Sequence, residues 1–190
     1  GCGDSCNPPN NQQGGGCTGR TCSNPMRVSE NPVRYSSGEI IVRSRDLEVG
    51  GYGVPWGHTR TFQSRLTNNE TIGNGFNWNV EEWPYLIVDY YGTVTVMGRA
   101  SGSLWFDKVD GAYVPRFSTK HVLELDSEAG LYRLSAPDGT ITEFDDFTGM
   151  FRKRIAPGGN SIEVTPMDTN AYNFTEVERT YTSGGDTITE

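Results

Sequence analysis

The sequence has no long apolar run and few basic residues. No apolar stretch approaches the roughly 20 residues that a membrane-spanning helix needs, so we expect no transmembrane segment. Lysine and arginine number 16 against 24 aspartate and glutamate residues, and the formal net charge is −8. Because nucleic-acid phosphates require a basic protein surface, this charge predicts that nucleic acid is not a partner.

Cysteine is absent after residue 22, and all four cysteines lie in a polar segment at the start: Cys2, Cys6, Cys17 and Cys22. A segment so poor in apolar residues cannot bury a core, which favours ordering by two intramolecular disulfides in one of three pairings. A zinc site with four thiolate ligands is the alternative, although the separation between Cys6 and Cys17 is short for such a site. Disulfides form in oxidising compartments, so the sequence predicts an extracellular or cell-surface (secreted) protein.

Short runs rich in β-branched and aromatic residues make up most of the chain after residue 32. Gly, Asn, Asp or Pro bounds each run, and such turn residues recur about every 8–12 positions. No stretch has the 3.6-residue apolar period of a helix. The sequence therefore predicts an all-β fold of antiparallel, short-strand sheets. The expected strands are 39–44, 59–64, 85–90, 93–97, 103–107, 121–125, 131–134, 140–144, 151–155 and 161–164.

Two segments near the end of the chain repeat one pattern. An Ala-Pro pair and a following glycine in residues 135–141 recur 20 positions later in residues 155–162. Strand–turn–strand units of about 20 residues are typical of solenoids and repeat arrays. We therefore expect three parts, which are a Cys-rich irregular segment and linker at 1–31, a β-rich domain at 32–134, and the start of repeats at 135–190.

A series of short motifs spans residues 31–165. They are Asn31-Pro32-Val33, Ser37-Gly38-Glu39, Arg45-Asp46, Arg60-Thr61-Phe62-Gln63-Ser64, Gly73-Asn74-Gly75-Phe76-Asn77-Trp78, Asp138-Gly139, Gly149-Met150-Phe151 and Gly159-Asn160-Ser161-Ile162. In this order they resemble the stretch that introduces the repeats of the RHS/YD-repeat family. Arg45 stands where that family usually has an acidic residue, and Phe62 where it usually has tyrosine. The resemblance implies a piece of a long bacterial surface or secreted protein, whose YD repeats wind into a β-solenoid or shell.

No catalytic arrangement stands out in the sequence. Adjacent acidic residues such as Asp145 and Asp146 point to opposite faces of a strand, which makes them a poor catalytic pair. Neither His58 nor His121 has a signature that ties it to a nucleophile or an acid. We therefore expect no catalytic residue, metal or cofactor, and a non-catalytic structural role. Its partners would be the remaining repeats of a longer chain or other protein subunits.

A carbohydrate- or protein-binding β module used in adhesion is the alternative function. Aromatic residues that could form an exposed binding platform, with surface glycans among the ligands, are Trp56, Trp83, Tyr85, Tyr90 and Tyr91. Packing in the core or between sheets is the competing interpretation for tryptophans such as Trp78 and Trp83.

Overall fold

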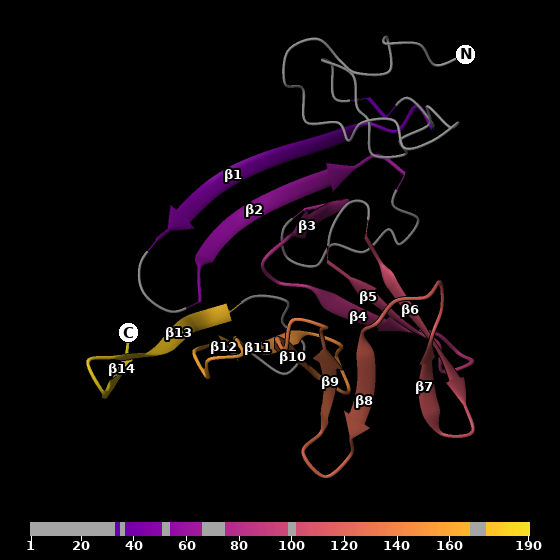
Figure 1. The fold of residues 1–190 in the computed structure, drawn as a ribbon. Coiled ribbons are helices and arrows are strands. Elements are labelled where there is room, and N and C mark those ends of the chain that lie inside the picture. Colours follow the sequence, from indigo (N-terminus) through magenta and orange to yellow (C-terminus); the bar gives the residue numbers. More distant parts are fainter. Residues whose placement is uncertain (1–32, 35–36, 51–53, 66–74, 99–101, 168–173) are drawn as a thin grey trace, which may run out of the picture.

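The computed structural model describes residues 33–34, 37–50, 54–65, 75–98, 102–167 and 174–190. Across these residues the chain forms fourteen β-strands, all antiparallel, and no helix (Figure 1). The predicted all-β class is therefore confirmed. The four cysteines and the predicted irregular segment lie outside the described residues. No helix in the described part of the chain is long and apolar enough to cross a membrane.

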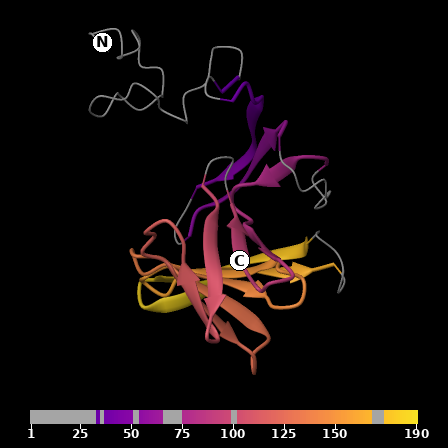
Figure 2. The ribbon, with the colours of Figure 1, turned by 90° about the vertical axis from the view of Figure 1, so that its right-hand side faces the viewer.

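Three strands form a small sheet in the order β1 (Ile41–Val49), β2 (Trp56–Gln63) and β3 (Trp78–Val80). β1 and β2 are long and curved, and they arch above the rest of the molecule (Figures 1 and 2). The register of β1 against β2 shifts between Arg45 and Leu47, which leaves Asp46 as an extra residue. This bulge changes which side chains share a face of the sheet.

The other eleven strands form one sheet in which each strand pairs with the next along the chain. Turn chemistry explains the regular meander. Glycines 139 and 159 both have positive φ, and each donates its N–H at 2.9 Å to the carbonyl of the alanine three residues earlier. The strands are β4 (Tyr85–Val88), β5 (Val94–Met97), β6 (Leu104–Val109), β7 (Ala112–Pro115), β8 (Val122–Asp126), β9 (Leu131–Ser135), β10 (Ile141–Asp145), β11 (Phe151–Ile155), β12 (Ser161–Pro166), β13 (Phe174–Ser183) and β14 (Asp186–Thr189).

One face of this larger sheet carries the main hydrophobic core. Val94, Phe106 and Phe144 are completely buried, on β5, β6 and β10. Five further buried side chains join them, which are Leu86, Val96, Leu123, Tyr132 and Leu134. Because side chains alternate between faces of a strand, each short strand contributes one or two residues to this core. The sheet continues through the predicted boundary at residues 134–135, and the division into domains remains a prediction.

Candidate functional site

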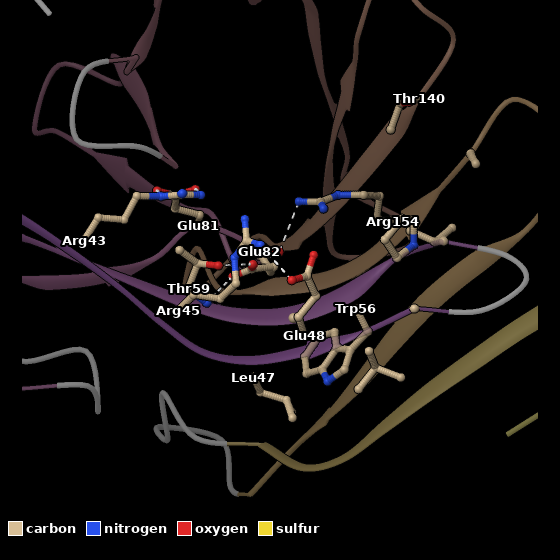
Figure 3. A pocket seen from close by; sticks show the side chains of 16 residues that line it. Arg43, Arg45, Leu47, Glu48, Trp56, Thr59, Glu81, Glu82, Thr140 and Arg154 are labelled. Carbon is tan, nitrogen blue, oxygen red and sulfur yellow. Dashed lines mark hydrogen bonds and ion pairs between the residues drawn. The ribbon is translucent and has the colours of Figure 1, made fainter. Parts of the chain in front are cut away.

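A groove of about 680 Å³ lies between the three-stranded sheet and the turns of the larger sheet (Figure 3). One wall comes from β1, β2 and the turn after β3. The other comes from the turn before β10 and from the end of β11. We call it the inter-sheet groove, and its lining residues are Arg43, Arg45, Leu47, Glu48, Val49, Gly50, Val54, Pro55, Trp56, Gly57, Thr59, Glu81, Glu82, Thr140, Arg154 and Ala156.

Three charged side chains of β1 lie on the groove side of the small sheet. Arg43 and Arg45 lie opposite Thr61 and Thr59 of β2, and opposite residues share a face of the sheet. Residues three positions apart would normally point to opposite faces. The extra residue at the bulge brings Glu48 back to the groove side, where Arg45 Nη1 donates to Glu48 Oε2 at 2.7 Å.

Each half-exposed arginine of the groove has a carboxylate partner. Arg43 donates through Nε and Nη2 to both oxygens of Glu81, each at 2.8 Å, and these bonds raise the pKa of the guanidinium. The side chains of Arg43 and Arg45 are nevertheless 53% and 51% exposed. Glu48 is 65% exposed, and an ion pair at such a position contributes little to stability, so Arg45 can exchange its partner at small cost. The two-bonded pair of Arg43 with Glu81 is the firmer of the two, because Thr61 also donates to Glu81 at 2.9 Å.

The carboxylate of Glu82 is held by two hydrogen bonds from β2. The backbone N–H and the hydroxyl of buried Thr59 both donate to the Glu82 carboxylate at 2.8 Å. Arg154 Nη2 donates to the backbone carbonyl of Glu82 at 3.1 Å. A Cβ atom at Gly57 would lie 2.9 Å from Glu82 Oε1 and 3.2 Å from the Leu47 carbonyl oxygen, so a side chain there would displace this carboxylate. The contact with Arg154 also joins the two sheets.

An aromatic cluster lies at the apolar end of the groove. Trp56, which lines the groove, stacks on Trp83 with ring centroids 5.3 Å apart and an interplanar angle of 26°. His58 and Phe174 meet the same Trp83 ring edge-on, at 5.1 and 4.8 Å. The Trp83 Nε1 atom is buried and has no hydrogen-bond partner among the described residues. Flat rings stacked beside charged groups are suited to holding another planar ring.

The face of β2 that carries Trp56 and His58, opposite to the face of Arg43 and Arg45, also carries a carboxylate–imidazole pair that the sequence analysis did not anticipate. The bulged residue Asp46 lies 3.1 Å from Nδ1 of His58 and accepts two hydrogen bonds from Arg60. The bonds from Arg60 hold the pKa of Asp46 well below its ordinary value. A carboxylate at Nδ1 fixes the orientation of an imidazole and leaves Nε2 for acid–base chemistry. No sequence signal marks this pair, because a bulge brings its members together.

The five aromatic residues singled out from the sequence fall into three places. Trp56 and Trp83 stack beside the groove. Tyr85 is buried, and its hydroxyl donates to Asn79 Oδ1 at 3.2 Å, so its ring is not available to a ligand. Tyr90 and Tyr91 are almost fully exposed in the β4–β5 turn, with their rings edge to face. A binding role for these aromatic residues remains a prediction.

Two other titratable residues considered from the sequence, His121 and Asp145, have structural partners. His121 Nδ1 lies 2.8 Å from the hydroxyl of Thr119. Asp145 accepts hydrogen bonds from Thr148 and Arg152, within a turn. Within the described ranges, no group of three or more His, Cys, Asp or Glu side chains could hold a metal ion.

Part of this chain is similar in sequence to three known proteins. No family model matches the chain. The chain is 28% identical over 143 residues to the tRNA3(Ser)-specific nuclease WapA of Bacillus spizizenii. It is 27% identical over 143 residues to the tRNA nuclease WapA of Bacillus subtilis and to the tRNA(Glu)-specific nuclease WapA of Bacillus subtilis subsp. natto. Each match covers 75% of this chain and 6% of the relative, so the chain spans a small part of these proteins.

These findings overturn four expectations from the sequence. The assignment to the RHS/YD-repeat family is corrected, because the relatives are named as tRNA nucleases. The same names contradict a non-catalytic structural or adhesive role, the absence of enzyme activity, and the exclusion of nucleic acid as a partner. The charge argument considered only these 190 residues, whereas the named activity belongs to proteins of which the chain spans 6%.

Proposed function

We propose that this chain is a segment of a nuclease that acts on tRNA. The similarity to three tRNA nucleases, over 75% of the chain, carries this proposal. The activity of the relatives belongs to polypeptides of which the matched region is 6%, so the proposal concerns the longer protein to which the chain contributes. That protein acts outside the cell or at its surface, in agreement with the disulfides expected in residues 1–31.

The segment helps to bind tRNA, in a way that is common to nucleases of different tRNA specificity. Relatives named for tRNA3(Ser) and for tRNA(Glu) match the chain over the same length and with nearly the same identity. A region shared in this way does not distinguish the two tRNAs. Contacts to phosphate have this property, because they position a nucleic acid without reading its sequence.

We assign this contact with tRNA phosphates to the inter-sheet groove. Arg43 and Arg45 are half exposed, and guanidinium groups bind phosphate oxygens in pairs. Trp56 offers a ring face on which an unpaired tRNA base can stack. When tRNA binds, the two arginines exchange Glu81 and Glu48 for phosphates, while Glu82 stays fixed by Thr59.

Binding of tRNA to paired variants tests this function. In the natural polypeptide, Arg43→Gln with Arg45→Gln should weaken tRNA binding at least tenfold and flatten its salt dependence by up to about 0.7–0.9 per lost contact. The control, Arg116→Gln with Arg133→Gln, removes two arginines that are 40% exposed and ion-paired outside the groove. Equal weakening by both pairs would overturn the assignment to the groove. Failure of the unchanged polypeptide to cleave any tRNA would overturn the nuclease function itself.

A further inference from the structure

Strands β7 and β8 are neighbours in the larger sheet but are joined by a single residue pair, Tyr113 with Leu123. On either side, β6 pairs with β7 through four residue pairs and β8 pairs with β9 through five. Figure 1 shows the β6–β7 and β8–β9 hairpins spreading apart toward their turns. Continued register would place Ala112 opposite Glu124, and that pair is not formed.

The space between the two hairpins is a cavity of about 460 Å³, which we call the hairpin notch. Its lining includes Lys108, Ala112, Tyr113, Val122, Glu124 and Leu125. Where β7 and β8 separate, their backbone N–H and C=O groups border both sides of the opening. An open strand edge of this kind is a template for pairing with another extended chain.

The inner side of the notch is apolar. Leu125 lies two residues after buried Leu123, so both side chains point to the core face of the sheet. Leu125 is nevertheless 39% exposed, because β7 has moved away from the position that would cover it. The Tyr113 hydroxyl lies 3.1 Å from that of Tyr132, which forms the floor beside Leu125.

The outer side of the notch is acidic. Glu124 lines it, and the exposed residues Asp110 and Glu128 lie in the two hairpin turns that border it. The one lysine among the lining residues, Lys108, has its ammonium group 5.7 Å from the centre of the Tyr113 ring. Asp126 already accepts a hydrogen bond from Arg133 at 2.6 Å. Three carboxylates, those of Asp110, Glu124 and Glu128, outnumber this one lysine, so the net charge around the opening is negative.

We propose that the hairpin notch binds an extended segment of a partner protein, which adds as a strand to the edge of β8. An incoming strand with alternating side chains places apolar residues over Leu125 and basic residues beside Glu124. β8 is the receiving strand because Glu124, Leu125 and Asp126 continue it beyond the Tyr113–Leu123 pair, whereas β7 has only Ala112 on that side. This site is separate from the inter-sheet groove and does not depend on the nuclease function.

Peptide binding to the full 190-residue chain tests the proposal. The probe is a fluorescein-labelled synthetic peptide that alternates valine and lysine, measured by fluorescence anisotropy. We expect saturable binding that is lost when the lysines are replaced by glutamate or when alternate positions are replaced by proline. No binding of the valine–lysine peptide, or equal binding of the proline peptide, would overturn strand addition.

Two variants locate the binding. Leu125→Asp should weaken binding of the valine–lysine peptide at least tenfold. Ile188→Asp, at a β14 residue that is 37% exposed, should leave this binding unchanged. Glu124→Lys changes only an exposed side chain, so it keeps the test valid if the leucine variant does not fold. The Glu124→Lys variant should bind the valine–lysine peptide more weakly and the valine–glutamate peptide more tightly than the unchanged chain does. Binding that neither Leu125→Asp nor Glu124→Lys alters contradicts the notch as the site.

Discussion

The backbone N–H of Leu86 donates to the carbonyl of Gly149 at 2.7 Å, and this bond joins the edge strand β4 to the turn between β10 and β11. The larger sheet therefore curls until its first strand, β4, meets the turn that follows β10, the sixth strand after it. The same contact sets the position of the small sheet, because β3 and the groove residues Glu81 and Glu82 immediately precede β4. Closing the sheet in this way thus brings Glu82 beside Arg154.

Gly149→Ala should lower the free energy of unfolding by about 2 kcal/mol or more. Gly149 has φ of 72°, and a Cβ atom there would lie 2.4 Å from the Leu86 carbonyl oxygen, so strain and a backbone clash add. Gly158→Ala is the matched control, since a Cβ there meets nothing within 4 Å. Urea unfolding measures both. Similar stabilities for the two variants would show that the Leu86–Gly149 contact does not hold the fold.

Phe144→Ala should lower the free energy of unfolding by about 3–5 kcal/mol, because it leaves a cavity at a completely buried site. Phe147→Ala removes the same ring three residues later, where the side chain is 88% exposed, and should change stability by no more than about 0.5 kcal/mol. Thermal and urea unfolding compare the two. A large loss in the Phe147 variant would mean that this exposed ring packs against something outside the described residues.

The alternation of side chains made much of the larger sheet predictable. Ile141 and Phe144 are three positions apart and cannot share a face of a regular strand. The structure buries Thr142 and Phe144 on the core face and leaves Ile141 on the other. The register between β10 and β11 also shifts at Glu143. Strands β3 and β7 were not predicted, because one has three residues and the other ends in proline.

The groove could not be predicted from the sequence. Arg43 and Glu81 are 38 positions apart, and Arg154 and Glu82 are 72 apart. The pairing of β1, β2 and β3 brings Arg43 to Glu81, and the curl of the larger sheet brings Arg154 to Glu82. Local composition does identify Trp56 and Trp83 as candidates, but it does not show that they stack on one another.

The Asp145 carboxylate should make stability depend on pH in the acid range. Burial raises its pKa, but hydrogen bonds from Arg152 and Thr148 outweigh burial, and the pKa lies below the ordinary value. The unfolded chain therefore binds the proton more readily than the folded chain. The stabilisation is complete above the ordinary pKa, near 3.9, and is lost as the pH falls through the lower folded value.

Comparing Asp145→Asn with the unchanged chain tests this expectation. The difference in unfolding free energy should be largest near pH 6 and should shrink as the pH falls below about 4. Asp110→Asn, in an exposed turn, provides a control for the loss of one negative charge. If the difference in unfolding free energy between Asp145→Asn and the unchanged chain stays constant from pH 6 to about pH 2, the ionisation of Asp145 does not contribute to stability.

Exchange of the matched region between nucleases should leave the choice of tRNA unchanged. The relatives named for tRNA3(Ser) and tRNA(Glu) match this chain equally, so we propose that the shared region holds tRNA through contacts that carry no sequence information. The experiment places the corresponding region of the tRNA(Glu)-specific relative into the natural polypeptide that contains this chain, and makes the reciprocal exchange as its control. Sequencing of the cleaved tRNAs should show that each hybrid cuts the tRNA of its recipient. A hybrid that instead cuts the tRNA of the donor would contradict sequence-independent contact and would place the recognition of tRNA within the exchanged region.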